Sequence, residues 1–127
     1  MVFGVFDRLH AGHLYFLGHV ARQGEVVVVV ARDSSVRKLK DKEPKQREKE
    51  RIVGVKKTGL IKKAILGDNE LGSYKIVKKI KPDVICLGYD QEALEKDLKR
   101  YLSESELKIK IIKIKSFKAN KFHTSLL

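Results

Sequence analysis

Short apolar runs, separated by stretches with helical spacing, organise the chain. The run Glu25–Ala31 (EVVVVVA) is β-branched at nearly every position, which predicts a strand buried on both faces. Four further segments have the composition of strands: Met1–Phe6, Ala64–Leu66, Val84–Leu87 and Lys108–Ile114. In the last of these, Lys alternates with Ile. The chain is therefore predicted to contain five strands.

Predicted helices fill the gaps between these strands. The first runs from about Gly12 to Gln23 and ends at Gly24, where a residue with positive φ is needed. Asp33 and Ser34 have the side chains of a helix N-cap, and so does Ser73. The remaining predicted helices are Gln46–Lys57, the segment from Ser73 that Pro82 ends, and Glu92 to about Leu102.

Strands that alternate with helices imply right-handed crossovers and a doubly wound parallel sheet. We therefore predict an α/β, Rossmann-like fold with about five parallel strands, in a single domain that covers residues 1–127. Ligands of such sheets bind beyond the carboxyl ends of the strands, near the point where the strand order reverses. Residues that carry chemistry are expected directly after the strands.

The charge is unevenly distributed. The chain holds 28 Lys and Arg against 16 Asp and Glu, a formal net charge of +12. Two segments concentrate it, Arg37–Lys63 and Lys108–Lys121. Such segments suit nucleic acid or a polyanionic small molecule. Because the chain lacks a nucleic-acid motif and a row of aromatics for base stacking, we favour the small molecule and consider nucleic acid unlikely.

Cysteine and apolar content limit the class of protein. The lone cysteine, Cys86, excludes an intramolecular disulfide and a cysteine-based zinc site, and its apolar neighbours predict core packing. The longest wholly apolar run, Val26–Ala31, is far shorter than a membrane span. Met1 leads directly into a strand rather than a signal peptide, so a reduced cytoplasm is expected. Few Asn and Gln with abundant Lys and Glu suggest a thermophile.

Two histidines follow the first predicted strand. His10 and His13 bracket the small pair Ala11-Gly12 on the first turn of the next helix. A helix N-terminus favours phosphate, and imidazoles beside it add donors that follow charge developing on transferring phosphoryl oxygens. Gly12 lets a ligand approach the backbone. The chain has neither a P-loop nor the Rossmann G-x-G-x-x-G. This pattern favours a phosphate-handling site of another type.

The segment Gly4–His13, G-x-F-D-x-x-H-x-G-H, resembles the signature of the HIGH-type nucleotidylyltransferase superfamily. Ala31–Val36 (ARDSSV), followed by Lys38 and Lys40, is similar to a segment of archaeal FAD synthases. Further similar segments are Ala64–Asp68 (AILGD), Ile80–Ile85 (IKPDVI) and Leu87–Gln91 (LGYDQ). The similarity spans nearly the whole chain, in order.

The resemblance implies the reaction ATP + FMN → FAD + pyrophosphate, with Mg²⁺. His10 and His13 would contact the triphosphate and stabilise the transition state, while Val5 and Phe6 line the nucleotide pocket with backbone groups. Asp7 would orient substrate, Mg²⁺ or the histidines, or serve as a structural hydrogen-bonding group. The metal ligands are left unassigned. A homodimer is expected.

The resemblance also assigns residues outside this motif. Lys38 and Lys40 match basic positions that reach phosphates, with Lys38 counted among the catalytic residues, or they are merely solvated. Asp90 would read the adenosine, or cap the next helix. Gly88 and Tyr89 would shape that wall, Arg51 (or else Arg47) would bind phosphate, and Thr124-Ser125 would start a phosphate-binding helix.

Two other functions remain open. One is a cytidylyltransferase acting on glycerol 3-phosphate or a similar phospho-alcohol, although the Arg and Gly usual in that class are missing ahead of Thr124-Ser125. The other is a non-catalytic nucleotide- or RNA-binding protein that uses the basic segments. The intact pair His10 and His13 argues against it, since binding alone does not need both.

Overall fold

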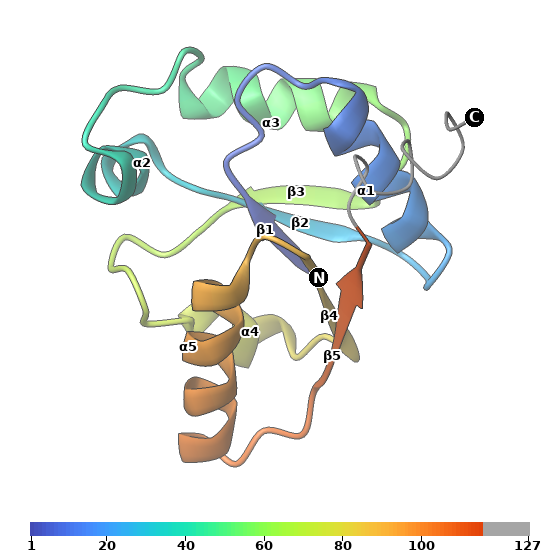
Figure 1. Cartoon of the computed structure of the whole chain (residues 1–127), viewed down its shortest axis with the longest axis vertical. Helices are drawn as coiled ribbons and strands as arrows, with labels where there is room; N and C mark the ends of the chain where they lie inside the picture. Colours follow the sequence, from blue (N-terminus) through green and yellow to red (C-terminus); the bar gives the residue numbers. More distant parts are fainter. Residues whose placement is uncertain (116–127) are drawn as a thin grey trace, which may run out of the picture.

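The computed structural model describes residues 1–115, in which strands and helices alternate (Figure 1). The strands are β1 (Val2–Gly4), β2 (Val27–Val30), β3 (Lys63–Leu66), β4 (Val84–Gly88) and β5 (Lys110–Ile114). The helices are α1 (Ala11–Ala21), α2 (Asp33–Lys40), α3 (Glu48–Lys57), α4 (Lys75–Ile80) and α5 (Glu92–Glu104). The α/β class predicted from the hydrophobic pattern is confirmed.

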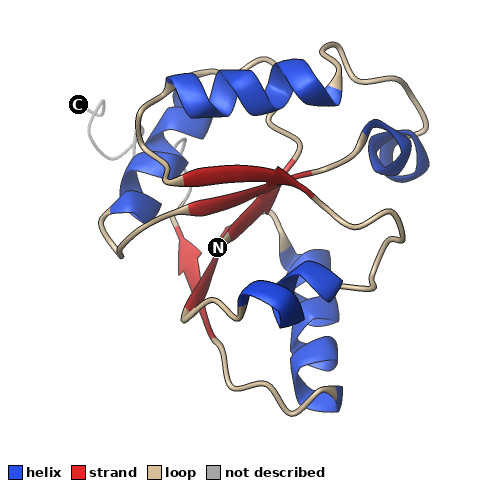
Figure 2. Cartoon of the chain, turned by 180° about the vertical axis from the view of Figure 1, so that it is seen from behind, coloured by secondary structure: helices blue, strands red, loops and turns tan. Residues whose placement is uncertain are grey.

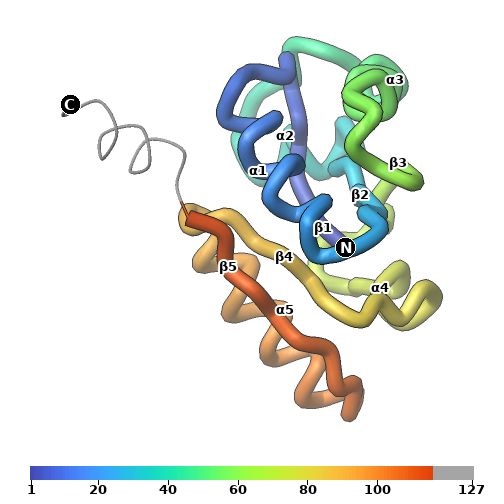
Figure 3. The backbone as a smooth tube through the Cα atoms, turned by 90° about the vertical axis from the view of Figure 1, so that its right-hand side faces the viewer, coloured from blue at the N-terminus to red at the C-terminus, as the bar shows by residue number. Residues whose placement is uncertain are grey.

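All strand pairs are parallel, but they fall into two groups. One sheet has the order β1-β2-β3, and β4 pairs with β5 in a second. The backbone N–H of Cys86 donates to the Met1 carbonyl at 3.0 Å, which places β4 beside the start of β1. Beyond that point the two sheets lie at an angle to each other (Figure 3). We call the boundary between β1 and β4, where the two sheets diverge, the seam.

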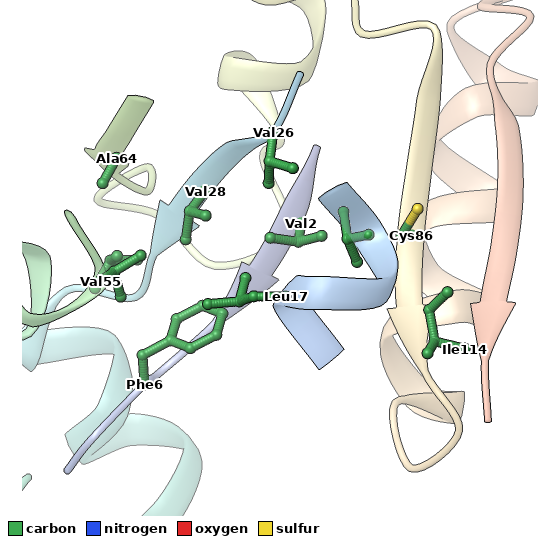
Figure 4. Close-up of a cluster of buried hydrophobic side chains, with 11 residues drawn as sticks. Val2, Phe6, Leu17, Val26, Val28, Val55, Ala64, Cys86 and Ile114 are labelled. Carbon is green, nitrogen blue, oxygen red and sulfur yellow. The ribbon is translucent and has the colours of Figure 1, made fainter. Parts of the chain in front are cut away.

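Helices cover both faces of the strands (Figure 2). On one face Leu17 of α1 and Val55 of α3 pack against Val2 and Val28, all fully buried (Figure 4). On the other face, buried residues of α4 and α5 pack against β4: Val77, Leu98, Leu102, Ile85 and Leu87. Two cores on opposite faces are the arrangement that a doubly wound fold requires.

Two predicted helix caps are wrong. Asp33 is the first residue of α2 rather than its cap, because its carboxylate is bonded to Arg51. Ser73 does not cap α4, which begins at Lys75 after a left-handed residue, Tyr74 (φ 48°). The Ser73 hydroxyl instead donates to the carboxylate of Asp68 at 3.0 Å. In the first case the guanidinium of Arg51, and in the second the nearby carboxylate of Asp68, binds the side chain that local spacing assigned to the cap.

Cys86 is buried, as predicted, and burial raises the pKa of its thiol, which suits packing rather than reactivity. Gly24, after α1, has the predicted positive φ of 144°. Across the part of the chain that the structure describes, no helix is long and apolar enough to span a bilayer.

Candidate active site

The turn after β1 brings the two predicted catalytic histidines together. His10 is the N-cap of α1 and His13 lies in its first turn. Their rings stack with centroids 4.0 Å apart and planes inclined by 27°. Phe6 (φ 53°) and Arg8 (φ 55°) take left-handed conformations in this turn. Such conformations are costly for non-glycine residues and concentrate at functional sites.

Backbone donors fix the orientation of both imidazoles. The N–H of Gly12 donates to Nδ1 of His10 at 3.0 Å, and the N–H of His10 donates to Nδ1 of His13 at 3.2 Å. Because each Nδ1 accepts, the proton of each neutral ring resides on Nε2. Both histidines therefore present an Nε2–H donor away from the helix backbone, at a helix end whose first turn carries no acidic residue.

The electrostatic surroundings of His13 favour its neutral form. Partial burial and the adjacent His10 lower the pKa of His13 most; Asp7 raises it, and Lys40 lowers it by a still smaller effect. A neutral imidazole with its proton on Nε2 can donate a hydrogen bond to a phosphoryl oxygen without first being protonated.

Glycine and phenylalanine support this pair. A Cβ on Gly12 would lie 2.9 Å from Cε1 of His10, so the glycine makes room for the imidazole as well as for a ligand. Similarly, a Cβ on Gly4 would lie 2.7 Å from Cε2 of Phe6. The Phe6 ring is buried in the core (Figure 4). Its centroid lies 5.6 Å from that of the His13 ring. Phe6 thus supports His13 from the core, and Ala11 is exposed at the start of α1.

Asp7 serves a structural role in this geometry. Its carboxylate accepts hydrogen bonds from the backbone N–H groups of Lys45 (2.7 Å) and Gln46 (2.8 Å). The N–H of Arg8 donates back to the Gln46 side chain at 2.8 Å. Partial desolvation would raise the pKa of Asp7, but these N–H donors and the nearby Arg51 lower it. Of the two roles predicted for Asp7, the hydrogen-bonding one fits these contacts.

The predicted phosphate contact of Arg51 is not supported. Arg51 is fully buried, and its guanidinium donates to the carbonyl oxygens of Val5 (2.9 Å), Ala31 (2.7 Å) and Gln46 (3.0 Å). It also donates to the carboxylate of Asp33 at 2.6 Å. Val5 and Ala31 directly follow β1 and β2, so these bonds fix the ends of both strands. Arg51 thereby helps to position the turn that carries the histidines. The Val5 carbonyl, predicted to line the nucleotide pocket, is occupied by this bond.

The predicted cations of α2 lie at the surface. Lys38 and Lys40 are exposed in the last turn of the helix. The positive charge of Lys40 is the smallest of the influences that lower the pKa of His13. Lys38 is not among the groups that shift the pKa of His13. Arg47, the alternative to Arg51, is exposed at the N-cap of α3.

The loop after β4 lies on the other side of the seam. Tyr89 and Asp90 are exposed there, and a Cβ on Gly88 would lie 3.0 Å from Oδ1 of Asp90. The N-cap of α5 is Gln91, and no side-chain oxygen caps the helix. The alternative that Asp90 is a helix cap is therefore wrong, and its carboxylate is available to a ligand.

Gln91 is the functional candidate that sequence reasoning missed. Its Nε2 donates to the Phe3 carbonyl at 3.0 Å, and its Oε1 accepts from the Gly88 N–H at 2.9 Å. One amide thus joins the carboxyl ends of β1 and β4 across the seam. The segment LGYDQ was noted, but the partner of this amide lies 88 residues away, beyond any local pattern.

Two sequence predictions, the phosphate-binding residues Thr124-Ser125 and the metal ion, concern features that these contacts do not include. Thr124 and Ser125 fall outside the described residues 1–115. Within those residues, no group of three or more His, Cys, Asp or Glu side chains is arranged to hold a metal ion.

Comparison with known proteins identifies the family. The model of the family described as "Cytidylyltransferase-like" matches residues 1–127. A protein named FAD synthase from Aciduliprofundum boonei is 41% identical over 118 residues, covering 92% of this chain and 78% of that protein. Another FAD synthase, from Methanothermus fervidus, is 41% identical over 122 residues, covering 93% and 83%.

A solved structure agrees with the fold. The crystal structure named as a lipopolysaccharide core biosynthesis protein from Thermoplasma volcanium has a TM-score of 0.84 and 38% identity. The match covers 92% of this chain and 95% of that one. The resemblance to HIGH-type nucleotidyltransferases, first based on the segment Gly4–His13, is confirmed. The chain belongs to the cytidylyltransferase-like family.

Proposed function

We propose that this protein is an FMN adenylyltransferase, which transfers AMP from ATP to FMN and releases pyrophosphate. The observation that carries the proposal is the stacked pair His10 and His13, with both Nδ1 atoms bonded to backbone N–H groups and both Nε2–H groups left to donate. The choice of ATP and FMN is supported by the archaeal relatives named FAD synthase, about 40% identical over most of the chain.

In this reaction a phosphate oxygen of FMN attacks the α-phosphorus of ATP. A phosphorus–oxygen bond forms to FMN as the bond to the bridging oxygen of pyrophosphate breaks. The FMN phosphate is already ionised, so no side chain has to remove a proton, and catalysis consists of positioning and charge stabilisation. His10 and His13 donate from Nε2 to the phosphoryl oxygens on which charge increases. The positive charge of Lys40 acts on the same pair at longer range.

Nucleotide recognition is assigned to the loop after β4. The free carboxylate of Asp90 accepts hydrogen bonds from the ribose or an exocyclic amine, and Gly88 and Tyr89 form the wall beside it. Mg²⁺ usually binds through substrate phosphates with one or two carboxylates, and it would enter here with the triphosphate. Asp7 is the carboxylate closest in sequence to the histidines, but its two oxygens already accept backbone N–H groups. No side chain is assigned as a metal ligand.

The test is a substrate matrix. Purified protein is incubated with ATP or CTP and with FMN or glycerol 3-phosphate, and pyrophosphate release and product mass are measured. We expect FAD from ATP and FMN, at least tenfold faster than any other combination. A CDP-alcohol as the main product would replace the proposal with the cytidylyltransferase alternative, and RNA binding without turnover would replace it with a binding protein. The homodimer and the cytoplasmic location stay predictions.

A further inference from the structure

A polar hollow of about 470 Å³ lies at the carboxyl ends of β2 and β3. Its wall includes Arg32 after β2, Gly67 and Asp68 after β3, and Lys75 and Lys79 of α4. This volume lies within the roughly 300–1,000 Å³ of small-molecule sites. None of the residues assigned above to the nucleotide lines the hollow, so it is a separate feature of the same sheet edge.

Arg32 is the best anion-binding group in this wall. Its Nε donates to the Gly67 carbonyl at 2.7 Å, which anchors the guanidinium to the end of β3. A guanidinium carries five N–H donors in a rigid fork, so four remain on its two terminal nitrogens. Because Arg32 is only partly exposed, water competes less for them than on an open surface. This arrangement suits bidentate binding of a phosphate.

The carboxylates in the wall offset only part of its positive charge. Oδ2 of Asp68 accepts from the Ser73 hydroxyl at 3.0 Å, so Asp68 is engaged in holding its own loop. Glu70 is exposed. Lys75 and Lys79, both exposed, bring the wall to three cations against two carboxylates. Asn69 and the two carboxylates add hydrogen-bonding groups to the wall, which suit hydroxyls on a ligand that also carries a phosphate.

The hollow lies at the carboxyl ends of strands on the side of β1 away from β4. In the three-stranded sheet, β2 and β3 lie on one side of β1, while β4 and its loop lie on the other. The N–H of Ala31, the residue before Arg32, donates to the Gly4 carbonyl at the end of β1. Phosphoryl transfer needs the attacking and leaving oxygens roughly in line across the phosphorus. A nucleotide bound at the loop after β4 and an acceptor bound at the hollow would lie on opposite sides of β1, which suits this requirement.

We infer that this hollow binds the acceptor, a phosphomonoester with a hydroxylated chain, and that Arg32 holds its phosphate. The inference rests on the proposed function, since it assigns FMN, the acceptor of that reaction, to the hollow. It adds a residue that the histidine motif does not contain.

Flavin fluorescence gives a test independent of turnover. FMN and riboflavin, which lacks the phosphate, are titrated onto the protein with αβ-methylene-ATP, whose bridge cannot be cleaved. We expect Arg32→Ala to weaken FMN binding at least tenfold and riboflavin binding less than twofold. Arg37→Ala, an exposed arginine paired with Glu43 at the surface, is the matched control and should change neither. Unchanged FMN affinity in Arg32→Ala overturns the inference.

A second pair of variants avoids any dependence on the Arg32–Gly67 bond. Lys79→Glu and Lys78→Glu reverse the charge of neighbouring exposed residues of α4, but only Lys79 lines the hollow. We expect weaker FMN binding and a raised KM for FMN in Lys79→Glu, with an unchanged KM for ATP. Equal effects of both variants would show a long-range effect of charge and contradict the site.

The two proposals fail in different ways. If the wild-type protein makes FAD but neither Arg32→Ala nor Lys79→Glu changes the affinity for FMN, the acceptor binds elsewhere. The proposed adenylyltransferase activity is then retained. If the wild-type protein neither binds FMN nor makes FAD, the proposed function and the inference fall together.

Discussion

The loops after β1 and after β4 meet at the seam but are held very differently. The loop after β1 is bonded through the Asp7 carboxylate, the Arg8 N–H and the Val5 carbonyl to partners around α3. Among the described residues, one side chain, Gln91, ties the loop after β4 to β1. A rigid region suits transition-state stabilisation, which needs donors fixed in advance, whereas a lightly tied region can adapt to a base.

The strongest disruption of the rigid region is Arg51→Met. It leaves the Asp33 carboxylate and three carbonyl groups without their donor, and breaking a buried ion pair typically costs about 3–5 kcal/mol. We expect a loss of that size in the free energy of unfolding, measured by urea titration. Arg47→Met, at an exposed arginine of the same segment, should lose almost nothing. A stable Arg51→Met protein with a raised KM for ATP would restore Arg51 as a phosphate ligand.

The second variant, His13→Ala, tests whether the histidines of the rigid region stabilise the transition state. Loss of a preorganised donor to the transition state typically costs about 2.7–4 kcal/mol, or 10²–10³-fold in kcat. We expect this loss with little change in melting temperature, and a similar loss for His10→Ala. His19→Ala, on the same helix with its ring tilted against that of Tyr15, is the control and should keep normal turnover. Near-normal kcat in His13→Ala would remove the histidines from the catalytic assignment.

Gln91→Met tests the lightly tied region. The variant removes the hydrogen bond to Phe3 across the seam and the local one from Gly88, and each unsatisfied polar group costs about 1–3 kcal/mol if it stays buried. We expect a KM for ATP raised about tenfold, a poorer discrimination against CTP and an almost unchanged kcat. Gln23→Met, at an exposed glutamine beyond α1, serves as the control. A loss of stability with unchanged KM and nucleotide preference would make Gln91 purely structural.

The smallest effect concerns pH. Burial lowers the pKa of His13 below its ordinary value of 6.5, so the unfolded chain binds this proton more readily than the folded one. Stability from this residue is therefore complete above pH 6.5 and is lost as the pH falls through the folded pKa. We expect the difference in unfolding free energy between pH 7 and pH 5 to be smaller in His13→Ala than in the wild type. An equal difference would contradict the depressed pKa.

The sequence predicted what short-range patterns encode. The run of valines predicted β2, because a strand buried on both faces has apolar residues at consecutive positions. Helical spacing of apolar residues predicted the helices beside it. The histidine pair was found in the same way, since its spacing and its position after a strand are local. The family followed from these segments in order.

Contacts between distant segments were not predictable in this way. Arg51 was predicted to bind phosphate, yet its partners Val5 and Ala31 lie 46 and 20 residues away. The division of the strands into two sheets depends on where β1 and β4 part, which no run of residues records. The amide of Gln91 was invisible for the same reason. Burial of a polar group depends on tertiary partners, whereas hydrophobic periodicity depends on the element alone.

The backbone bonds to the two Nδ1 atoms have a consequence for how such a protein can diversify. The state of the imidazoles is set by main-chain N–H groups of the turn, which substitutions of surrounding side chains leave in place. The side chains assigned to nucleotide and acceptor, Asp90 and Arg32, belong to other turns of the sheet edge. Substrate preference can therefore change by substitution at those turns without rebuilding the catalytic donors, so new specificities are accessible through single replacements in a working enzyme.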